Sequence, residues 1–297
     1  MSDMIGSGMI GSGPSAESGA AAYDPSVPLA VSPLTATIGA EVGGVDLADD
    51  LSDATVAELR ALLLEWKVLF VRNQHALDRD AHVALGRRFG DLEVHPITPE
   101  GQAHPEVFVI PAGGTFKAPG VWHSDVTWRP EPSMGSILRA VELPPLGGDT
   151  LWADMGAAYD LLDDATKEAI DGLVAFHDFV RAFGWNRSAE DQARMREEHP
   201  TQEHPVVRTH PETGRKTLYV NAAFTCGIKD MEQADAVALL DRLERQSAIP
   251  DVQCRFRWEP GSVAFWDNRA TQHIVSNDFL PARRVMERVT IAGDRPV

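Results

Sequence analysis

Two residues with metal-binding side chains, His123 and Asp125, stand two positions apart in the chain. In an extended segment, residues i and i+2 point to the same face, so one imidazole and one carboxylate can bind a single ion side by side. A second histidine, His273, lies far downstream and can complete the set from another strand. Two histidines and one carboxylate on one face of an octahedral ion leave the opposite positions open, as iron(II) oxygenases require. These residue types therefore predict an iron site.

Arginines gather shortly after His273, at Arg283, Arg284 and Arg288 of a strand-like segment. A guanidinium is a rigid fork that binds a carboxylate through two parallel hydrogen bonds. A buried arginine beside a metal is unfavourable unless an anion pairs with it, which indicates a dicarboxylate such as 2-oxoglutarate. The alternative is a surface strand in which the arginines form ordinary salt bridges.

Three motifs agree with the iron-site interpretation. They are the segments Trp122–Thr127, Gly147–Trp152 and Trp266–Arg269, the last followed by His273. Through them the chain resembles, over residues 30–297, the taurine dioxygenase (TauD/TfdA) family of iron(II)- and 2-oxoglutarate-dependent dioxygenases. The resemblance implies an α+β fold that is mainly β with peripheral helices, namely a double-stranded β-helix (jelly roll, cupin-like).

The resemblance also implies a role for each residue of these motifs. Iron(II) is expected on His123, Asp125 and His273, which are the catalytic residues. The distal carboxylate of the cosubstrate 2-oxoglutarate is expected on Thr150 and Arg284. O2 is the second cosubstrate. The expected reaction hydroxylates a C–H bond of a small anionic organic substrate, with succinate and CO2 as coproducts.

The substrate pocket is expected to clamp an anion. In the taurine-using members of the family, an arginine, a histidine and a backbone amide hold a sulfonate. The matching positions here are Arg288, His95 and Val126. The resemblance therefore implies that the anion clamp is intact.

The other half of the pocket is expected to differ from that of the taurine-using members. They hold the amine of the substrate through a tyrosine, an asparagine and a serine, whereas this chain has Thr98, Pro119 and Ala182 at those positions. Loss of hydrogen-bonding groups relaxes discrimination for the polar group that they contact. Phe183, Phe224 and Trp128 offer aromatic walls instead. We therefore expect an alkyl sulfonate, alkyl sulfate or carboxylate with an apolar tail.

Three alternatives stay open from the sequence. The first is a specialised biosynthetic oxygenase that acts on an amino-acid-like carboxylate. The second is a zinc-type metallohydrolase, because two histidines and a carboxylate also bind zinc. The third is a non-catalytic small-molecule sensor.

Composition limits the partners. With 297 residues, of which 43% are hydrophobic, the chain can bury a substantial core. Its net charge of −17 disfavours binding to nucleic acid or to an anionic membrane surface. Two cysteines are too few for a disulfide framework, and the N-terminus lacks the pattern of a secretory signal, so we expect a cytoplasmic protein. The resemblance adds the expectation of a homo-oligomer.

The hydrophobic pattern predicts the elements that position these residues. Residues 1–22 are small and polar and predict a disordered tail, and residues 23–297 predict a single dioxygenase domain. Helices are expected at 53–66, from 78 or 80 to 90, 155–162, 165–173 and 232–246. Strands are expected at 67–71, 107–110, 136–141, 150–153, 217–220, 253–258, 262–266 and 284–292. The charged segment 183–201 predicts an exposed insertion, either a substrate lid or a solvated helix.

Some polar residues outside the motifs also need an interpretation. We expect structural or surface roles for four histidines, His177, His199, His204 and His210, since no close pairing favours a second metal. Asn268 and Arg269 are expected behind His273, where they would support the metal ligand.

Overall fold

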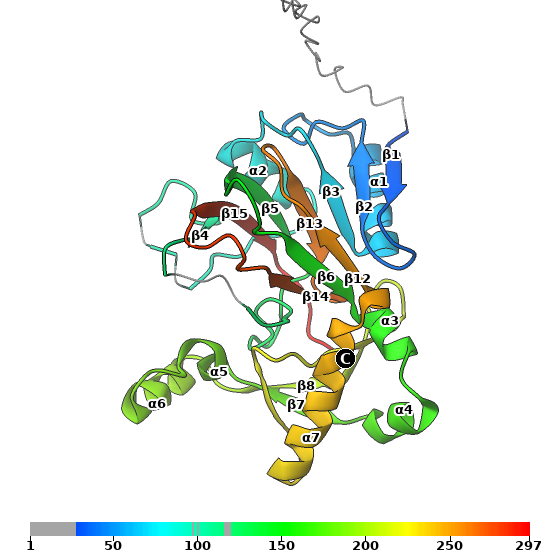
Figure 1. The fold of residues 1–297 in the computed structure, drawn as a ribbon, viewed down its shortest axis with the longest axis vertical. Coiled ribbons are helices and arrows are strands. Elements are labelled where there is room, and N and C mark those ends of the chain that lie inside the picture. The colour runs from blue at the N-terminus through cyan, green and yellow to red at the C-terminus, as the bar shows by residue number, and fades with distance from the viewer. Residues whose placement is uncertain (1–27, 97, 100, 116–119) are drawn as a thin grey trace, which may run out of the picture.

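A seven-stranded sheet forms the largest layer of the protein (Figure 1). The computed structural model describes residues 28–96, 98–99, 101–115 and 120–297, so the predicted tail and Pro119 lie outside the described residues. The strand order is β1 (Ala30–Pro33), β2 (Ala40–Gly43), β3 (Val68–Val71), β13 (Val263–Asp267), β5 (Gly135–Glu142), β15 (Arg284–Ile291) and β4 (Phe108–Ala112). Neighbouring strands are antiparallel except β2 and β3, which are parallel.

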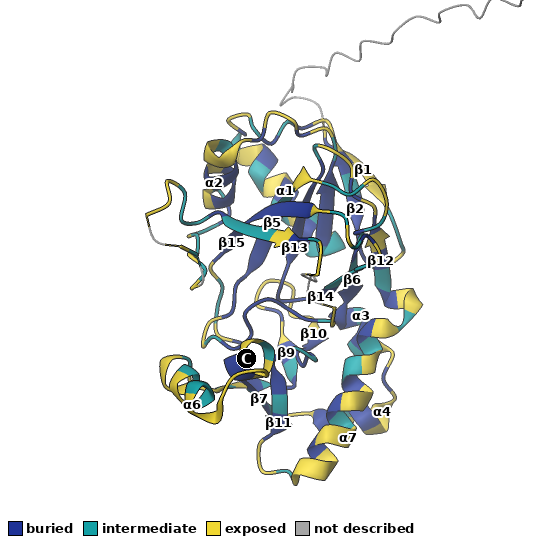
Figure 2. Cartoon of the chain, turned by 60° about the vertical axis from the view of Figure 1, so that its left-hand side comes forward, coloured by how far each residue is buried: buried dark blue, intermediate teal, exposed yellow. Residues whose placement is uncertain are grey.

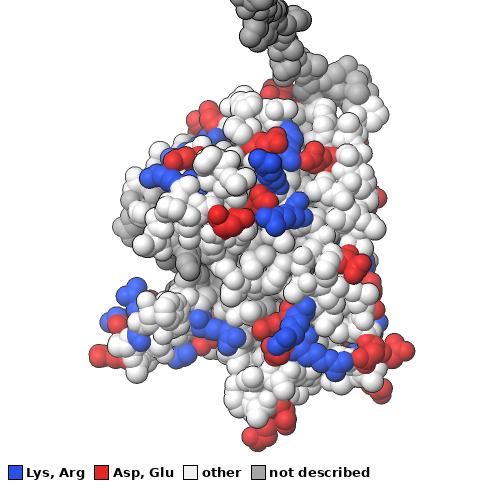
Figure 3. Space-filling model, viewed as in Figure 1, with Lys and Arg blue, Asp and Glu red and all other residues white. Residues whose placement is uncertain are grey.

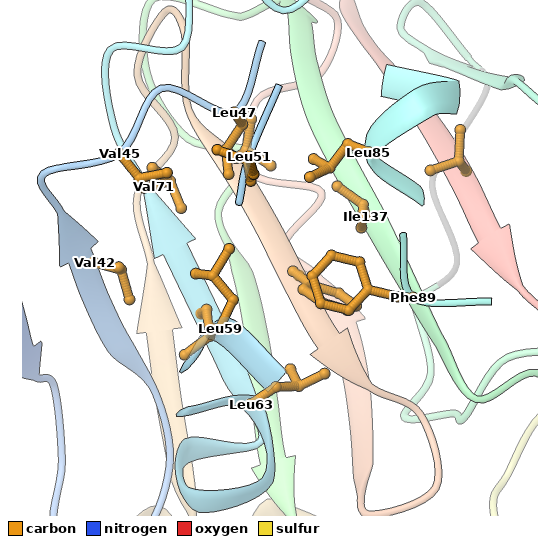
Figure 4. Packing of buried hydrophobic residues seen from close by; sticks show 14 of the residues in the cluster. Val42, Val45, Leu47, Leu51, Leu59, Leu63, Val71, Leu85, Phe89 and Ile137 are labelled. Atoms are coloured by element: carbon orange, nitrogen blue, oxygen red, sulfur yellow. The ribbon is translucent and has the colours of Figure 1, made fainter. Parts of the chain in front are cut away.

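Two helices, α1 (Asp53–Trp66) and α2 (Arg79–Arg87), cover one face of this sheet. Each begins where the sequence predicts, because Ser52 and Asp78 accept hydrogen bonds from free backbone amides of the first turn. Figure 4 illustrates the packing, with Leu59 and Leu63 of α1 on the sheet together with Val71 and other aliphatic residues. Val289 and Ile291 of β15 belong to this core, so that face of the strand is packed under the helices.

A smaller sheet packs on the opposite face. It consists of β12 (Gln253–Phe256), β6 (Thr150–Asp154) and β14 (Thr271–Val275). Aromatic residues fill the space between the two sheets, since Phe70 of β3 stacks on Phe256 at 4.0 Å and contacts Trp152 of β6 edge-on at 5.3 Å between ring centroids. The candidate site residues of β6, β14 and β15 lie between these two sheets.

A third group of elements lies below the sheets in Figure 1. It contains the sheets β11-β7-β8 and β10-β9 and helices packed beside them: β7 (Val174–His177), β8 (Gln202–Pro205), β9 (Val207–Thr209), β10 (Lys216–Leu218), β11 (Thr225–Ile228), α3 (Met155–Asp160), α4 (Asp164–Ile170), α7 (Gln233–Glu244) and the 3-10 turns Arg245–Ala248 and Pro250–Val252. Two further helices, α5 (Phe179–Phe183) and α6 (Ala189–Glu198), extend to one side. No residue of α6 is buried, as Figure 2 shows by its colours.

Most predicted elements are confirmed, with ends shifted by a few residues. Helix 53–66 agrees at both ends, whereas the helix predicted to reach Gly90 already ends at Arg87 and the strand predicted at 217–220 lies at 216–218. The sequence did not predict strands β1, β2, β7, β8, β9 and β11 or helix α5. These strands have three or four residues, too few to reveal a period. The described chain is thus a mixed α/β fold with many strands and no closed barrel.

Membrane-spanning potential, surface charge and the state of the cysteines complete the description of the fold. No helix among the described residues is long and apolar enough to cross a membrane. On the face drawn in Figure 3, basic side chains lie among acidic ones rather than in a field of one sign. Both cysteines are free thiols.

Candidate active site

The three predicted metal ligands come together between the sheets. One ligand atom from each of His123, Asp125 and His273 lies within 4.8 Å of the others, and all three residues are buried. The imidazole Nε2 of His123 is 3.9 Å from Oδ1 of Asp125, and the two imidazole rings are 4.2 Å apart. Two imidazoles and one carboxylate are a donor set that suits iron(II). The arrangement can therefore hold one divalent cation.

Backbone pairing brings the two histidines to the same place. His123 and His273 form an isolated antiparallel bridge, with N···O distances of 3.1 and 2.8 Å. His273 also pairs with Trp152 across β14 and β6, so both side chains face the large sheet. Trp152 lies in the core between the sheets, which fixes this orientation.

Hydrogen bonds leave nitrogen atoms of both rings available. Nδ1 of His123 lies 2.9 Å from the carbonyl oxygen of Val121, which leaves Nε2 as the ligand atom. Nδ1 of His273 is buried and has no hydrogen-bond partner among the described residues. Burial, with His123 alongside, lowers the pKa of His273 to about 3, so this ring is a neutral donor. Each ring therefore keeps a nitrogen that can bind a cation.

Asn268 holds the backbone of Asp125 from both sides. Its side-chain oxygen accepts from the amide of Asp125 at 2.7 Å, and its side-chain nitrogen donates to the carbonyl at 2.9 Å. The prediction that Asn268 and Arg269 support His273 is therefore wrong. Arg269 pairs instead with the buried Asp267 and with the partly exposed Glu212.

Arg288 is hydrogen-bonded to Asp125, one of the predicted metal ligands. Its Nη1 donates to Oδ2 of Asp125 at 2.7 Å, while its buried Nε has no partner among the described residues. Burial alone would raise the pKa of Asp125, but Arg288 and the two histidines together hold it well below its usual range. Asp125 therefore stays ionised, with one oxygen toward His123 and the other on Arg288.

Arg284 and Thr150, the predicted partners of the cosubstrate carboxylate, lie in direct contact. Arg284 is 2% exposed and donates to the carbonyl of Gly148 at 3.1 Å and to Oγ1 of Thr150 at 3.3 Å. Trp258 donates to the same hydroxyl at 3.0 Å. No carboxylate of the described residues pairs with Arg284, and burial lowers its pKa to about 10. A buried guanidinium without a counter-ion fits an incoming carboxylate group.

Strand periodicity explains why both arginines enter the site. Arg284, Met286 and Arg288 alternate along β15 with residues on the other face, and Met286 packs in the core between the sheets. Val289 lies on the opposite face, in the core under α1 and α2. Arg284 and Arg288 therefore point to the gap between the sheets, where the metal ligands are.

The predicted aromatic residues form one cluster on the Val126 side of Asp125. Val126, Trp128 and Phe224 are buried in one cluster, and Phe183 packs at its edge with 39% of its surface exposed. Ala182, one of the positions where the amine-binding side chains are missing, packs against the same cluster. The structure thus gives this side an apolar lining.

The sequence missed several members of the aromatic cluster. Phe179 of α5 contacts Trp128 edge-on at 4.7 Å and Phe183 at 4.6 Å between ring centroids. His199 and Met195 also pack here, so segment 183–201 is not wholly solvated as its charge pattern predicted. Their isolated positions in a charged segment gave no periodic signal.

His95, a predicted member of the anion clamp, lies near Arg288. Its ring stacks on Phe108 of β4 at 4.4 Å, and the guanidinium of Arg288 lies 5.6 Å from the same ring. Burial, and to a smaller extent Arg288, lower the pKa of His95 to about 4. His95 is therefore neutral at physiological pH and can donate one N–H to an anion.

A half-buried ion pair that the sequence did not reveal borders this region. Glu93 pairs with Arg129, whose guanidinium lies 5.2 Å from the ring of Trp128. Burial raises the pKa of Glu93, and Arg129 opposes that shift. Because the positive charge of Arg129 compensates Glu93, the Glu93 carboxylate repels an anionic ligand less than a carboxylate without a partner would.

Comparison with known proteins gives the family. The family model described as taurine catabolism dioxygenase TauD, TfdA family matches residues 30–290. The chain belongs to the TauD/TfdA family. It is 36% identical over 276 residues to an alpha-ketoglutarate-dependent sulfate ester dioxygenase of Pseudomonas putida, with 91% of each protein covered. It is 34% identical to an alkylsulfatase of Acinetobacter baylyi, over 91% of this chain and 87% of that protein.

A solved structure agrees with the TauD/TfdA assignment. The crystal structure of a taurine dioxygenase from Burkholderia xenovorans matches with a TM-score of 0.77 at 39% identity, over 91% of both chains. The predicted enzyme class is confirmed: this TauD/TfdA protein is an oxidoreductase that uses iron(II), 2-oxoglutarate (alpha-ketoglutarate) and O2. The family assignment decides against the zinc-type metallohydrolase and the non-catalytic sensor.

The remaining histidines have structural contacts. His177 lies 2.9 Å from Oγ1 of Thr127, Nε2 of His204 lies 3.0 Å from the carbonyl oxygen of Arg129, and Nε2 of His210 lies 2.9 Å from Asp267. All three are buried, and no second metal-binding group is found among the described residues. The prediction of structural roles is confirmed for these three.

Proposed function

We propose that His123, Asp125 and His273 hold iron(II) and that Thr150 and Arg284 hold the distal carboxylate of 2-oxoglutarate. The single observation that carries this proposal is the unpaired Arg284, buried beside a triad of metal-binding atoms within 4.8 Å of one another. Iron(II) supplies O2 activation coupled to oxidative decarboxylation of 2-oxoglutarate. We also propose that the two packed sheets are those of a double-stranded β-helix.

The proposed substrate is a linear alkyl sulfate, bound through its sulfate group. Arg288, His95 and the backbone amide of Val126 supply the donors. The unpartnered Nε of Arg288 supports this assignment, since a buried donor without a partner is rare and favours an incoming acceptor. Because Arg288 also contacts Asp125, an anion on Arg288 is held beside the metal ligands.

The apolar cluster supports an alkyl tail. Trp128, Phe179 and Phe224 are buried on the side of the pocket where taurine-using relatives would read an amine, and Ala182 adds a methyl group. Such a wall stabilises methylene groups by roughly 0.8 kcal/mol for each one buried, whereas it leaves an ammonium group without partners. This disfavours the alternative of an amino-acid-like substrate. The relatives that act on sulfate esters, by their names, agree with an alkyl sulfate.

The proposed reaction oxidises the carbon bonded to the ester oxygen. One oxygen atom of O2 enters that C–H bond as a hydroxyl, and the other enters succinate as 2-oxoglutarate loses CO2. The hydroxylated carbon then loses its C–O bond to sulfate and its hydroxyl proton, which gives an aldehyde and inorganic sulfate. Arg288 and His95 orient the sulfate so that this carbon, and not one further along the tail, lies nearest the triad.

A substrate panel tests the proposal. Enzyme with iron(II), 2-oxoglutarate and O2 is supplied separately with hexyl sulfate, hexanesulfonate, hexanoate, an aryloxypropanoate and taurine. Succinate, aldehyde and inorganic sulfate are then measured. We expect hexyl sulfate to stimulate succinate formation most, with one sulfate released per succinate. A preference for taurine, or succinate formation that hexyl sulfate does not stimulate, would refute the substrate assignment. A homo-oligomeric state and a cytoplasmic location stay predictions.

A further inference from the structure

Val126 has a backbone conformation that requires support. Its φ is +50°, in the left-handed region that β-branched residues rarely adopt. Its amide makes no hydrogen bond with another described residue, while its carbonyl accepts from Arg129 at 3.0 Å. Unfavourable backbone conformations persist only where surrounding contacts determine them. The contacts on either side of Val126 therefore decide where this amide points.

Asp125 and Thr127 are both fixed by buried side chains. Asn268 holds Asp125 on one side, as described above. On the other side, Oγ1 of Thr127 accepts from Nδ2 of Asn221 at 3.1 Å and lies 2.9 Å from Nδ1 of His177. Thr127 and His177 are completely buried, and Asn221 is 1% exposed.

The chemistry of the three groups allows a self-consistent set of hydrogen bonds. Asn221 donates to the hydroxyl oxygen, so the hydroxyl proton of Thr127 is free to be donated to His177. That bond requires a neutral imidazole. Burial lowers the pKa of His177 well below its usual value, and His204 acts in the same direction.

These partners also belong to the segments that form the apolar wall. Asn221 accepts from the amide of Phe224 at 3.0 Å through its side-chain oxygen. His177 is the last residue of β7 and directly precedes Asp178, the N-cap of α5, which carries Phe179 and Phe183. The amide of Asp178 donates to the carbonyl of Phe224 at 2.9 Å. One hydroxyl therefore connects the segments of Val126, α5 and Phe224.

We infer that Thr127 is a positioning residue for the substrate: through Asn221 and His177 it aims the amide of Val126 at the sulfate and fixes the aromatic wall against it. The inference rests on the proposed function, because it takes the amide of Val126 as part of the anion clamp. We expect Thr127 to affect binding of the organic substrate and not of 2-oxoglutarate, because the proposed 2-oxoglutarate residues Thr150 and Arg284 lie on other strands.

Two variants at one position test the inference. Thr127→Val keeps the shape and removes the hydroxyl, and Thr127→Ser keeps the hydroxyl. We expect Thr127→Val to raise KM for hexyl sulfate about tenfold, as for loss of one buried hydrogen-bonded contact. We expect it to increase succinate formed per aldehyde, while KM for 2-oxoglutarate stays unchanged. Thr127→Ser should restore wild-type values.

Amide hydrogen exchange without substrate gives a second measurement. Exchange in peptides covering 124–129 and 221–225 should accelerate in Thr127→Val and stay slow in Thr127→Ser. If Thr127→Val does not fold, Asn221→Ala replaces it, with the same expectation. The inference would be overturned if Thr127→Val changed neither KM for hexyl sulfate nor the exchange rates. Equal effects of the two Thr127 variants, or a parallel rise in KM for 2-oxoglutarate, would also overturn it. If wild-type enzyme oxidises no alkyl sulfate, the proposed function fails, and the exchange comparison alone decides the role of Thr127.

Discussion

The two halves of the candidate site are built differently. The proposed cosubstrate half consists of Thr150, His273 and Arg284, which lie on the paired strands β6 and β14 and on β15. Apart from Arg288 of β15, the proposed substrate half consists of residues from separate loops and helix ends, among them His95, Val126 and Phe224. Strand pairing fixes the first half residue by residue. Only side-chain contacts across the fold assemble the second half.

The difference teaches where specificity can vary. A one-residue change in register would turn every side chain of β15 to the other face, so positions on this strand are strongly constrained. Loops and short helices tolerate substitution and insertion, as long as a few buried contacts hold them. Metal and 2-oxoglutarate binding should therefore depend on single residues, and substrate choice should depend on many small contributions.

The largest effect is expected at the triad. Asp125→Ala removes a proposed metal ligand and leaves Arg288 buried without its anion. Since even partners behind a metal ligand are worth roughly 10-fold to 100-fold, loss of the ligand should reduce turnover by more than about 100-fold. Mn(II) binding, followed by paramagnetic resonance, and succinate formation measure the effect. Asp171→Ala, an exposed carboxylate paired with Lys216, is the control. Turnover of Asp125→Ala at the control's rate would refute the metal assignment.

The cosubstrate cradle offers a control one residue away. Arg284 is buried without a carboxylate partner, whereas Arg283 is exposed and pairs with Glu142. Arg284→Ala should raise KM for 2-oxoglutarate by roughly 10-fold to 100-fold, because hydrogen bonds to charged groups are worth about 1.5–3 kcal/mol. Arg283→Ala should leave it unchanged. A larger effect on KM for the organic substrate would mean that the roles of Arg284 and Arg288 are reversed.

The packing of helix α2 on strand β5 should become less stable at acidic pH. His82 of α2 is buried, with Nε2 3.0 Å from the carbonyl oxygen of Ile137, and burial lowers its pKa to about 4. As pH falls below about 6.5, the unfolded chain takes up a proton that the folded His82 does not, so stability decreases toward the folded pKa.

Urea unfolding at about pH 7.5 and about pH 5.5 measures this contribution. His82→Gln should remove about 1 kcal/mol of the pH-dependent loss in the free energy of unfolding. His75→Gln, at an exposed histidine, should keep the wild-type dependence. The same slope in both variants would contradict the role of His82.

The smallest effect is expected at the rim of the apolar wall. Phe183 is partly exposed and contacts Phe179 and Phe224, whereas Trp185, two residues further, is 76% exposed. Phe183→Ala should reduce kcat/KM for hexyl sulfate about threefold to tenfold more than for ethyl sulfate, as for the loss of one apolar contact. Trp185→Ala should change neither. An equal loss of kcat/KM for ethyl sulfate and hexyl sulfate would show that Phe183 does not contact the alkyl tail.

The sequence predicted the long elements because their signals are strong. Helix 53–66 has a capping serine and apolar residues at helical spacing, and β15 is a strand of eight residues, all of them buried. Strands of three or four residues, such as β9 and β10, carry no period and were missed or shifted. Phe179 and Met195 were missed for a related reason, since single apolar residues in short or charged segments give no pattern.

By itself the sequence predicted the chemistry: residue types and spacing favoured a metal site at His123, Asp125 and His273, and the resemblance to the TauD/TfdA family implied a cosubstrate role for Thr150 and Arg284. Strand geometry then fixes the direction of each side chain, which is why local spacing suffices. Tertiary structure alone decided that Arg288 contacts a metal ligand, that Asn268 holds Asp125 rather than His273, and that Thr127 meets Asn221 and His177. These partners are dozens to more than a hundred residues apart in the chain, and packing of separate layers, which no local pattern encodes, brings them within hydrogen-bond distance.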